Sequence, residues 1–202
     1  MTALQDLFND MDIHLIKDDQ PSFYFIELSN TSIFDQYPFN MLSALKKTDQ
    51  SPKHHPEGNV WNHTMLVLDE AAKVKEKSTD KRVFMWAALL HDIGKPGTTK
   101  TRKGRITAYD HDLLGAELAG KFLREFTNDQ AFVTKVTYIV RWHMQILFVV
   151  NDLPYADINT MKAQTDIRDI ALFGLCDRLG RLSPDYAVEE NNIKKFIEKC
   201  SE

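Results

Sequence analysis

Several histidines and aspartates of this chain lie on the apolar faces, or at the ends, of segments with helical periodicity. They are His63, the adjacent pair His91 and Asp92, His111, His143 and Asp177. Burying such groups costs on the order of a few kcal/mol each unless they pair with one another or bind a metal. A single buried histidine is more often simply hydrogen-bonded, but several of these groups on separate segments favour a shared metal site. Imidazole and carboxylate ligands suit divalent ions such as Mn, Fe, Co, Ni, Zn or Mg.

The spacing of apolar residues predicts the helices that would position these groups. His63 falls within a predicted helix over 60–77, and the pair His91 and Asp92 ends an almost wholly apolar helix over 81–91. The other predicted helices cover 112–126 with His111 at its entrance, 131–144 with His143 on its apolar stripe, 166–181 with Asp177 on its buried face, and also 39–47 and 187–199. The fold class is therefore all-α, a helical bundle.

The first fifty residues are expected to differ from this helical part. A short apolar run over 23–28 lies between turn signals, which favours a short strand or an irregular segment over a long helix. We expect residues 1–50 to form a small N-terminal cap and residues 51–202 to form the metal-binding domain, with one compact domain overall.

The amino-acid composition of the chain limits which partners and which cellular location we expect. The net charge of −4 predicts no dedicated nucleic-acid binding, although the segment between Ile93 and Tyr109 holds five cations and no acid and is positive locally. Two isolated cysteines, Cys176 and Cys200, favour neither a disulfide framework nor a zinc finger. Neither a membrane span nor a signal peptide is recognisable, so we expect a cytoplasmic protein with no membrane partner.

The candidate ligands occur in motifs that together resemble the HD-domain metal-dependent phosphohydrolases. In the order of that family, the motifs are NVWNHTMLVLDEAA, WAALLHDIGKP, YDHDLLGAELA, VRWHM and LCDRLGR. The segment LSALKKTDQSPKHHPEGNVWNHT further resembles the HD domain appended to some bacterial CCA-adding tRNA nucleotidyltransferases, whose nucleotidyltransferase domain is absent from this sequence.

This resemblance implies a ligand set and a reaction. His63, His91, Asp92 and Asp177 would hold one divalent ion, and His111 with His143 would bind a second, so that Asp92 bridges the pair. The implied reaction is hydrolysis of a phosphoester by metal-activated water, with a nucleotide, a cyclic nucleotide or a similar phosphorylated small molecule as substrate.

Other residues near these motifs are candidates for catalysis or substrate binding. Asp92 and Lys95 are the expected catalytic residues, because an ammonium three residues after Asp92 would stabilise phosphoryl charge; alternatively Lys95 interacts with the C-terminal dipole of its helix. Further candidates for substrate contacts are Arg178, Arg181, His55 and Glu57. The arginines could instead pair with surface acids, and the other two could cap a loop.

Two functions from other classes fit the same residues. A few relatives with this six-ligand set are mixed-valent di-iron oxygenases, and a non-catalytic sensor of metals or nucleotides would need the same fold and ligands. Metal content with redox state would separate the oxygenase from the hydrolase, and turnover on phosphoesters would separate the sensor.

Overall fold

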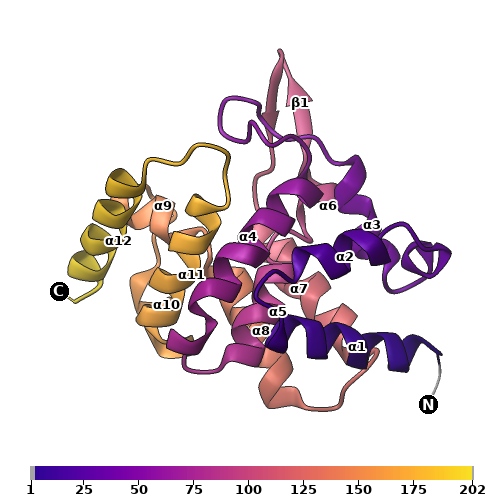
Figure 1. The fold of residues 1–202 in the computed structure, drawn as a ribbon. Helices are drawn as coiled ribbons and strands as arrows, with labels where there is room; N and C mark the ends of the chain where they lie inside the picture. The colour runs from indigo at the N-terminus through magenta and orange to yellow at the C-terminus, as the bar shows by residue number, and fades with distance from the viewer. Residues whose placement is uncertain (1–2, 202) are drawn as a thin grey trace.

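Helix α5, Lys81–Leu90, runs through the centre of the molecule, as its apolar sequence predicts. In the computed structural model, which describes residues 3–201, all eight residues of 83–90 are buried. Helices α1 (Ala3–Lys17), α4 (Val60–Val74) and α8 (Gln130–Trp142) pack around it (Figure 1). The end of α5 therefore delivers His91 and Asp92 into the interior.

The other elements cover this core. They are α2 (Ser22–Leu28), α3 (Asn40–Ser43), α6 (Lys95–Thr98), α7 (His111–Arg124), α9 (Gln145–Val150), α10 (Ile158–Gln164), α11 (Ile167–Leu179), α12 (Tyr186–Ser201), the 3-10 helices η1 (Ser32–Asp35), η2 (Ala44–Lys47) and η3 (Lys75–Lys77), and the strands β1 (Lys100–Arg102) and β2 (Arg105–Thr107). The described chain is thus helical apart from one two-stranded antiparallel sheet, which confirms the predicted all-α class.

Side-chain caps fix where several of these helices begin. Asn59 accepts a hydrogen bond from the backbone N–H of Asn62 at the start of α4, and Asp80 does the same for Val83 at the start of α5. Asp129 caps α8 in the same way. Each cap satisfies a backbone donor that the first helical turn leaves free, and it thereby fixes the residue at which the helix begins.

The prediction of a short strand or an irregular segment at the N-terminus was wrong, because residues 3–17 and 22–28 form helices α1 and α2. The apolar run over 23–28 is helical because Phe25 and Leu28, three residues apart, are buried while Phe23 is exposed. These helices share the core with the rest of the chain: α1 packs on α5 and α2 on α4, and Trp86 Nε1 donates to Asp12 Oδ1 at 2.6 Å.

Two segments that lie outside the predicted helices also contain regular structure. Residues 98–109 include the β1–β2 hairpin, which projects from the helical body (Figure 1). Residues 148–164 include the end of α9 and all of α10. Neither segment has the apolar periodicity by which the longer helices could be recognised.

Candidate metal centre

The six predicted ligands come together from five helices or helix ends. His63 lies in the first half of α4, His91 and Asp92 directly follow α5, and His111 is the first residue of α7. The remaining two are His143, directly after α8, and Asp177 near the end of α11. Their positions confirm the inward orientation predicted from the apolar stripes, since all but Asp177 are less than a tenth exposed.

One group of ligand atoms surrounds Oδ2 of Asp92. His91 Nε2 lies 3.2 Å from this oxygen and His63 Nε2 lies 4.0 Å from it. Asp177 reaches the same group through His63, whose Nε2 is 2.9 Å from Asp177 Oδ1. These distances bring His63, His91 and Asp92 together, and Asp177 adjoins them through His63, from which 114 residues separate it.

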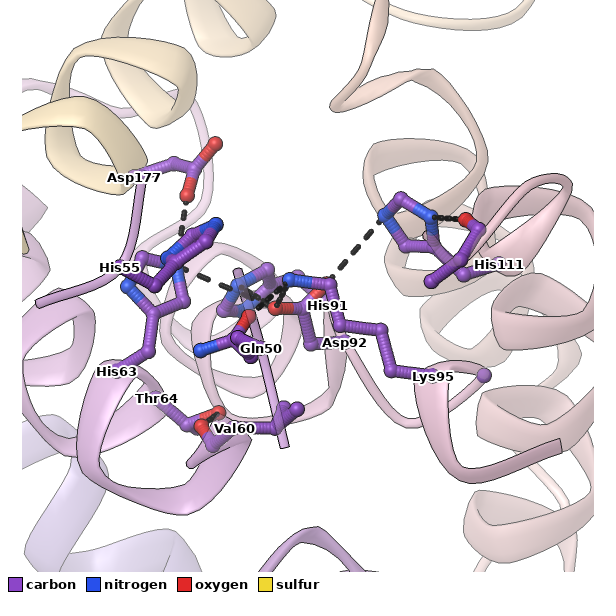
Figure 2. A network of polar contacts seen from close by, with 12 residues as sticks. Gln50, His55, Val60, His63, Thr64, His91, Asp92, Lys95, His111 and Asp177 are labelled. Atoms are coloured by element: carbon purple, nitrogen blue, oxygen red, sulfur yellow. Dashed lines mark hydrogen bonds and ion pairs between the residues drawn. The ribbon is translucent and has the colours of Figure 1, made fainter. Parts of the chain in front are cut away.

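A second group surrounds the other oxygen of the same carboxylate. Asp92 Oδ1 lies 3.4 Å from His111 Nε2 and 3.9 Å from His143 Nε2. Figure 2 shows His111 approaching Asp92 from the side opposite to His63 and Asp177. His63, His91 and Asp92 in the first group, and Asp92, His111 and His143 in the second, are close enough to one another for each set to hold one ion, and the two sets share Asp92.

Backbone carbonyls fix the protonation of three imidazoles. Nδ1 of His91, His111 and His143 lies 2.9, 2.6 and 2.7 Å from the carbonyl oxygen of the residue three positions earlier. A carbonyl only accepts, so each Nδ1 carries a proton and the Nε2 atom of each ring faces the centre. The Nε2 atoms of His111 and His143 lie 3.2 Å apart, close enough for both to coordinate one cation.

An unpartnered buried atom also fits a cation at this position. His91 Nε2 has no hydrogen-bond partner among residues 3–201, and the only partner of Asp92 Oδ2 there is the ammonium of Lys95. A buried polar atom without a partner costs about 1–3 kcal/mol, and coordination would remove that cost for His91 Nε2. The donor set of imidazole nitrogens and carboxylate oxygens suits borderline and hard divalent ions.

The electrostatics keep three of the ligands, Asp92, Asp177 and His143, in the forms that bind cations. Burial opposes the ionisation of Asp92, but the charges of Lys95 and His91 outweigh it and hold the pKa of this carboxyl well below its usual range. Burial likewise opposes the ionisation of Asp177, but its hydrogen bond with His63 holds its pKa well below the usual range. Burial lowers the pKa of His143 to about 4, so its ring is neutral near pH 7.

Comparison with known proteins gives the family. Residues 60–148 match the model of the HD domain, a range that includes His63, His91, Asp92, His111 and His143. This chain contains an HD domain. Members of this superfamily are commonly metal-dependent phosphohydrolases, and HD domains bind divalent metals. Asp177 lies beyond the matched range, and the structure brings it to the site.

Curated proteins similar to this chain include multifunctional CCA proteins. The chain is 35% identical over 103 residues to a multifunctional CCA protein of Halorhodospira halophila, an alignment that covers 51% of this chain and 23% of the relative. It is 25% identical over 184 residues to a multifunctional CCA protein of Methylococcus capsulatus, with 89% and 36% covered. The chain therefore spans only about a quarter to a third of these relatives.

No helix among the described residues is long and apolar enough to cross a membrane.

Lys95 of the HD domain lies against the shared carboxylate. Its Nζ is 2.7 Å from Asp92 Oδ2 and donates to Gln50 Oε1 at 2.5 Å (Figure 2). Lys95 was alternatively expected to interact with the C-terminal dipole of the helix before it. Instead, Lys95 is the first residue of the next helix, α6, and its ammonium pairs with Asp92. Gln50 was not predicted, and its sequence context carries no signal that would reveal it.

Glu57 and His55 lie behind His63. Glu57 Oε1 is 3.0 Å from His63 Nδ1 and 2.9 Å from His55 Nδ1, and Glu57 is almost fully buried. Burial opposes the ionisation of Glu57, but hydrogen bonds led by that of His63 lower its pKa to about 2. Burial and the charge of Lys95 lower the pKa of His55 to about 4. Glu57 is therefore an anion placed to orient His63 from the side away from Asp92.

Arg178 and Arg181, both predicted to contact substrate, lie in different surroundings. Arg178 Nη1 donates to Glu189 Oε2 of α12 at 2.9 Å, so the expected contact of Arg178 with substrate is not supported by its position. Arg181 lies past Gly180, where α11 has ended, and its Nε is buried without a hydrogen-bond partner among residues 3–201. The positive charge of Arg181 contributes to the lowered pKa of both Asp177 and His55.

Proposed function

We propose that this protein is a metal-dependent phosphohydrolase that uses two divalent ions to cleave a phosphoester of a nucleotide or related phosphorylated molecule. The observation that carries this proposal is the position of Asp92, whose two oxygens face two separate sets of ligands. A carboxylate placed in this way is the expected bridge between paired ions that act together on phosphoesters.

The ligands divide between the two ions. His63, His91, Asp92 and Asp177 would hold the first ion, and Asp92, His111 and His143 the second. When bound, such ions lower the pKa of a coordinated water and neutralise charge on the phosphoryl oxygens. With His63 Nε2 turned to the first ion, Nδ1 would carry the proton and face Glu57, which is a common support for a histidine ligand.

Two cations of the chain complete the site. Lys95 holds Asp92 Oδ2 and so positions the shared carboxylate, and its ammonium lies within reach of a phosphate that enters the centre. Arg181 has a buried Nε without a hydrogen-bond partner among residues 3–201, and its charge acts on Asp177, so its guanidinium would be available for a phosphoryl oxygen. His55 stays neutral near pH 7 and does not add to the positive charge.

The test is turnover combined with metal content. Protein stripped of metal and reloaded separately with Mn, Fe, Co, Ni, Zn and Mg should hydrolyse members of a panel of phosphodiesters and phosphomonoesters, including nucleotides. Asp92→Asn should lose both metal and turnover. Asp169→Asn should retain both, because Asp169 is a buried carboxylate that binds the backbone N–H of Thr79 and lies outside the centre.

Other outcomes identify the alternatives. Metal and nucleotide binding without turnover of any substrate would contradict hydrolysis and favour a sensor. Activity that requires iron and oxygen would favour the oxygenase.

A further inference from the structure

The β1–β2 hairpin is a concentrated positive feature on a protein whose net charge is −4. Its strands pair Lys100 with Thr107, Thr101 with Ile106, and Arg102 with Arg105. Side chains directly opposite each other, or two apart on one strand, lie on the same face of a sheet. Lys100, Arg102 and Arg105 therefore share one face.

This arrangement of charge is unfavourable for the hairpin alone. Arg102 and Arg105 are direct cross-strand neighbours, and like charges in that relation destabilise a sheet. Lys103 adds a further cation at the turn and has φ 50°, a conformation that is uncommon for any residue other than glycine, asparagine or aspartate. None of these cations makes a side-chain ion pair or hydrogen bond within the described part of the chain, and all are exposed. The repulsion is thus uncompensated in the protein alone.

The hairpin is joined directly to the metal centre at both ends. Residues 95–98 link Lys95, which binds Asp92, to the start of β1, and β2 is followed after three residues by His111. The ribbon extends from this base away from the helices (Figure 1). Its cationic face covers about 10 Å along the strands at roughly 3.3 Å per residue. A ligand bound along that face would lead towards the centre.

An aromatic ring lies at the base of the hairpin. Tyr109 is 76% exposed and is two residues before His111. Exposed aromatic rings beside cations are typical of surfaces that bind single-stranded nucleic acids, because bases stack on the rings while the cations hold the phosphates.

We propose that the hairpin binds the phosphate backbone of a single-stranded nucleic acid and leads its phosphoester to the metal centre. This inference rests on the proposed function and specifies its substrate as a strand. A mononucleotide could occupy only the base of the hairpin and would leave Arg102, Lys103 and Arg105 without an anion. The net charge predicted no dedicated nucleic-acid binding, but binding depends on the local field, and this surface is locally positive.

Other polyanions fit the hairpin less well. A membrane-binding tip requires apolar or aromatic side chains that insert into lipid, whereas this tip is Lys103 and Gly104. An acidic protein would neutralise the cations but would leave the exposed ring of Tyr109 without a base to stack on it.

The experiment measures binding of a labelled, hydrolysis-resistant phosphorothioate RNA strand of roughly 12 nucleotides. Anisotropy titrations across a salt series would compare the metal-loaded wild type, Arg102→Gln/Arg105→Gln, and the control Lys194→Gln/Lys195→Gln. The control removes the same charge from exposed positions on α12, away from the hairpin. Thermal melts would confirm that all three proteins are folded.

The hairpin variant should bind the strand roughly tenfold more weakly and reduce the salt slope by about 1.4, since each lost phosphate contact contributes ~0.7 for a single strand. The control should bind like the wild type, and a dinucleotide should compete poorly. Equal binding by the wild type and the hairpin variant, or equal losses in both variants, would overturn the inference. So would equally effective competition by polyglutamate or by anionic vesicles.

The same assays separate this inference from the proposed function. If small phosphodiesters are hydrolysed but the strand does not bind, only the assignment of the hairpin is wrong. If the strand binds through the hairpin but no phosphoester is hydrolysed, the proposed function is wrong and the binding surface stands.

Discussion

Replacing Gly94 with alanine tests how closely the turn after Asp92 must approach α7. A Cβ at Gly94 would lie 2.1 Å from the backbone oxygen of His111 and 2.6 Å from the backbone nitrogen of Gly115. To restore ordinary van der Waals separation, the two backbone segments must move apart by roughly 1 Å. Overpacking of this kind typically costs about 1–3 kcal/mol of stability.

The displacement acts directly on the second group of ligands. His111 Nε2 lies 3.4 Å from Asp92 Oδ1, and a shift of roughly 1 Å would take the pair to the limit that one ion can span with bonds of about 2.0–2.2 Å, at which the two bonds would have to be collinear. We therefore expect Gly94→Ala to lower the free energy of unfolding and to lose the ion held by His111 and His143. The ion held by His63 and Asp177 should remain.

Urea unfolding and metal analysis of the purified variant would measure both effects. Gly97→Ala is the matched control, since its Cβ would meet only the flexible end of the Leu114 side chain, at 2.7 Å. If Gly94→Ala keeps wild-type stability and a full metal complement, the close approach of the two segments is not what positions His111, and this reasoning is refuted.

Three further predictions concern single residues of the centre. His143→Ala should lose one of two ions and keep the other, because only Asp92 is common to both groups; loss of both ions in a folded variant would argue against separate groups. Lys95→Gln should keep its metal but turn over roughly 10- to 100-fold more slowly, since Lys95 positions Asp92 without being a ligand; a wild-type rate would remove it from the mechanism. Glu57 has a pKa of about 2, below the ordinary 4.5, so its contribution to stability is present above pH 4.5 and is lost as the pH falls towards 2. Urea unfolding of metal-free protein should therefore show a loss of up to about 3 kcal/mol over this range in the wild type and a smaller loss in Glu57→Gln; parallel pH profiles would contradict the assignment.

The site could be predicted because its ligands lie on strongly periodic helices. His143, for example, continues the stripe of Val136 and Val140, and the burial of that stripe determines the direction of the ring. Asp177 could be found in the same way from Phe173, even though it lies outside the range matched by the HD domain.

Features set by chain reversals and long-range contacts could not be predicted. Arg178 and Arg181 are three residues apart, but α11 ends between them at Leu179, so Arg178 pairs with Glu189 of α12 whereas Arg181 lies beyond the helix. The hairpin was missed because its strands are short and polar and because a Lys-Gly turn lacks the usual Asn-Gly signal. The N-terminal helices were missed because short apolar runs between turn signals fit a strand as well as a helix.

Anomalous diffraction from crystals soaked in saturating Mn²⁺ is the most direct test of the shared role of Asp92. We predict two peaks per chain about 3.5–4 Å apart, one on each side of the Asp92 carboxylate, with His63, His91 and Asp177 at one and His111 and His143 at the other. A single peak at saturation, or two peaks that do not share Asp92, would contradict the binuclear centre.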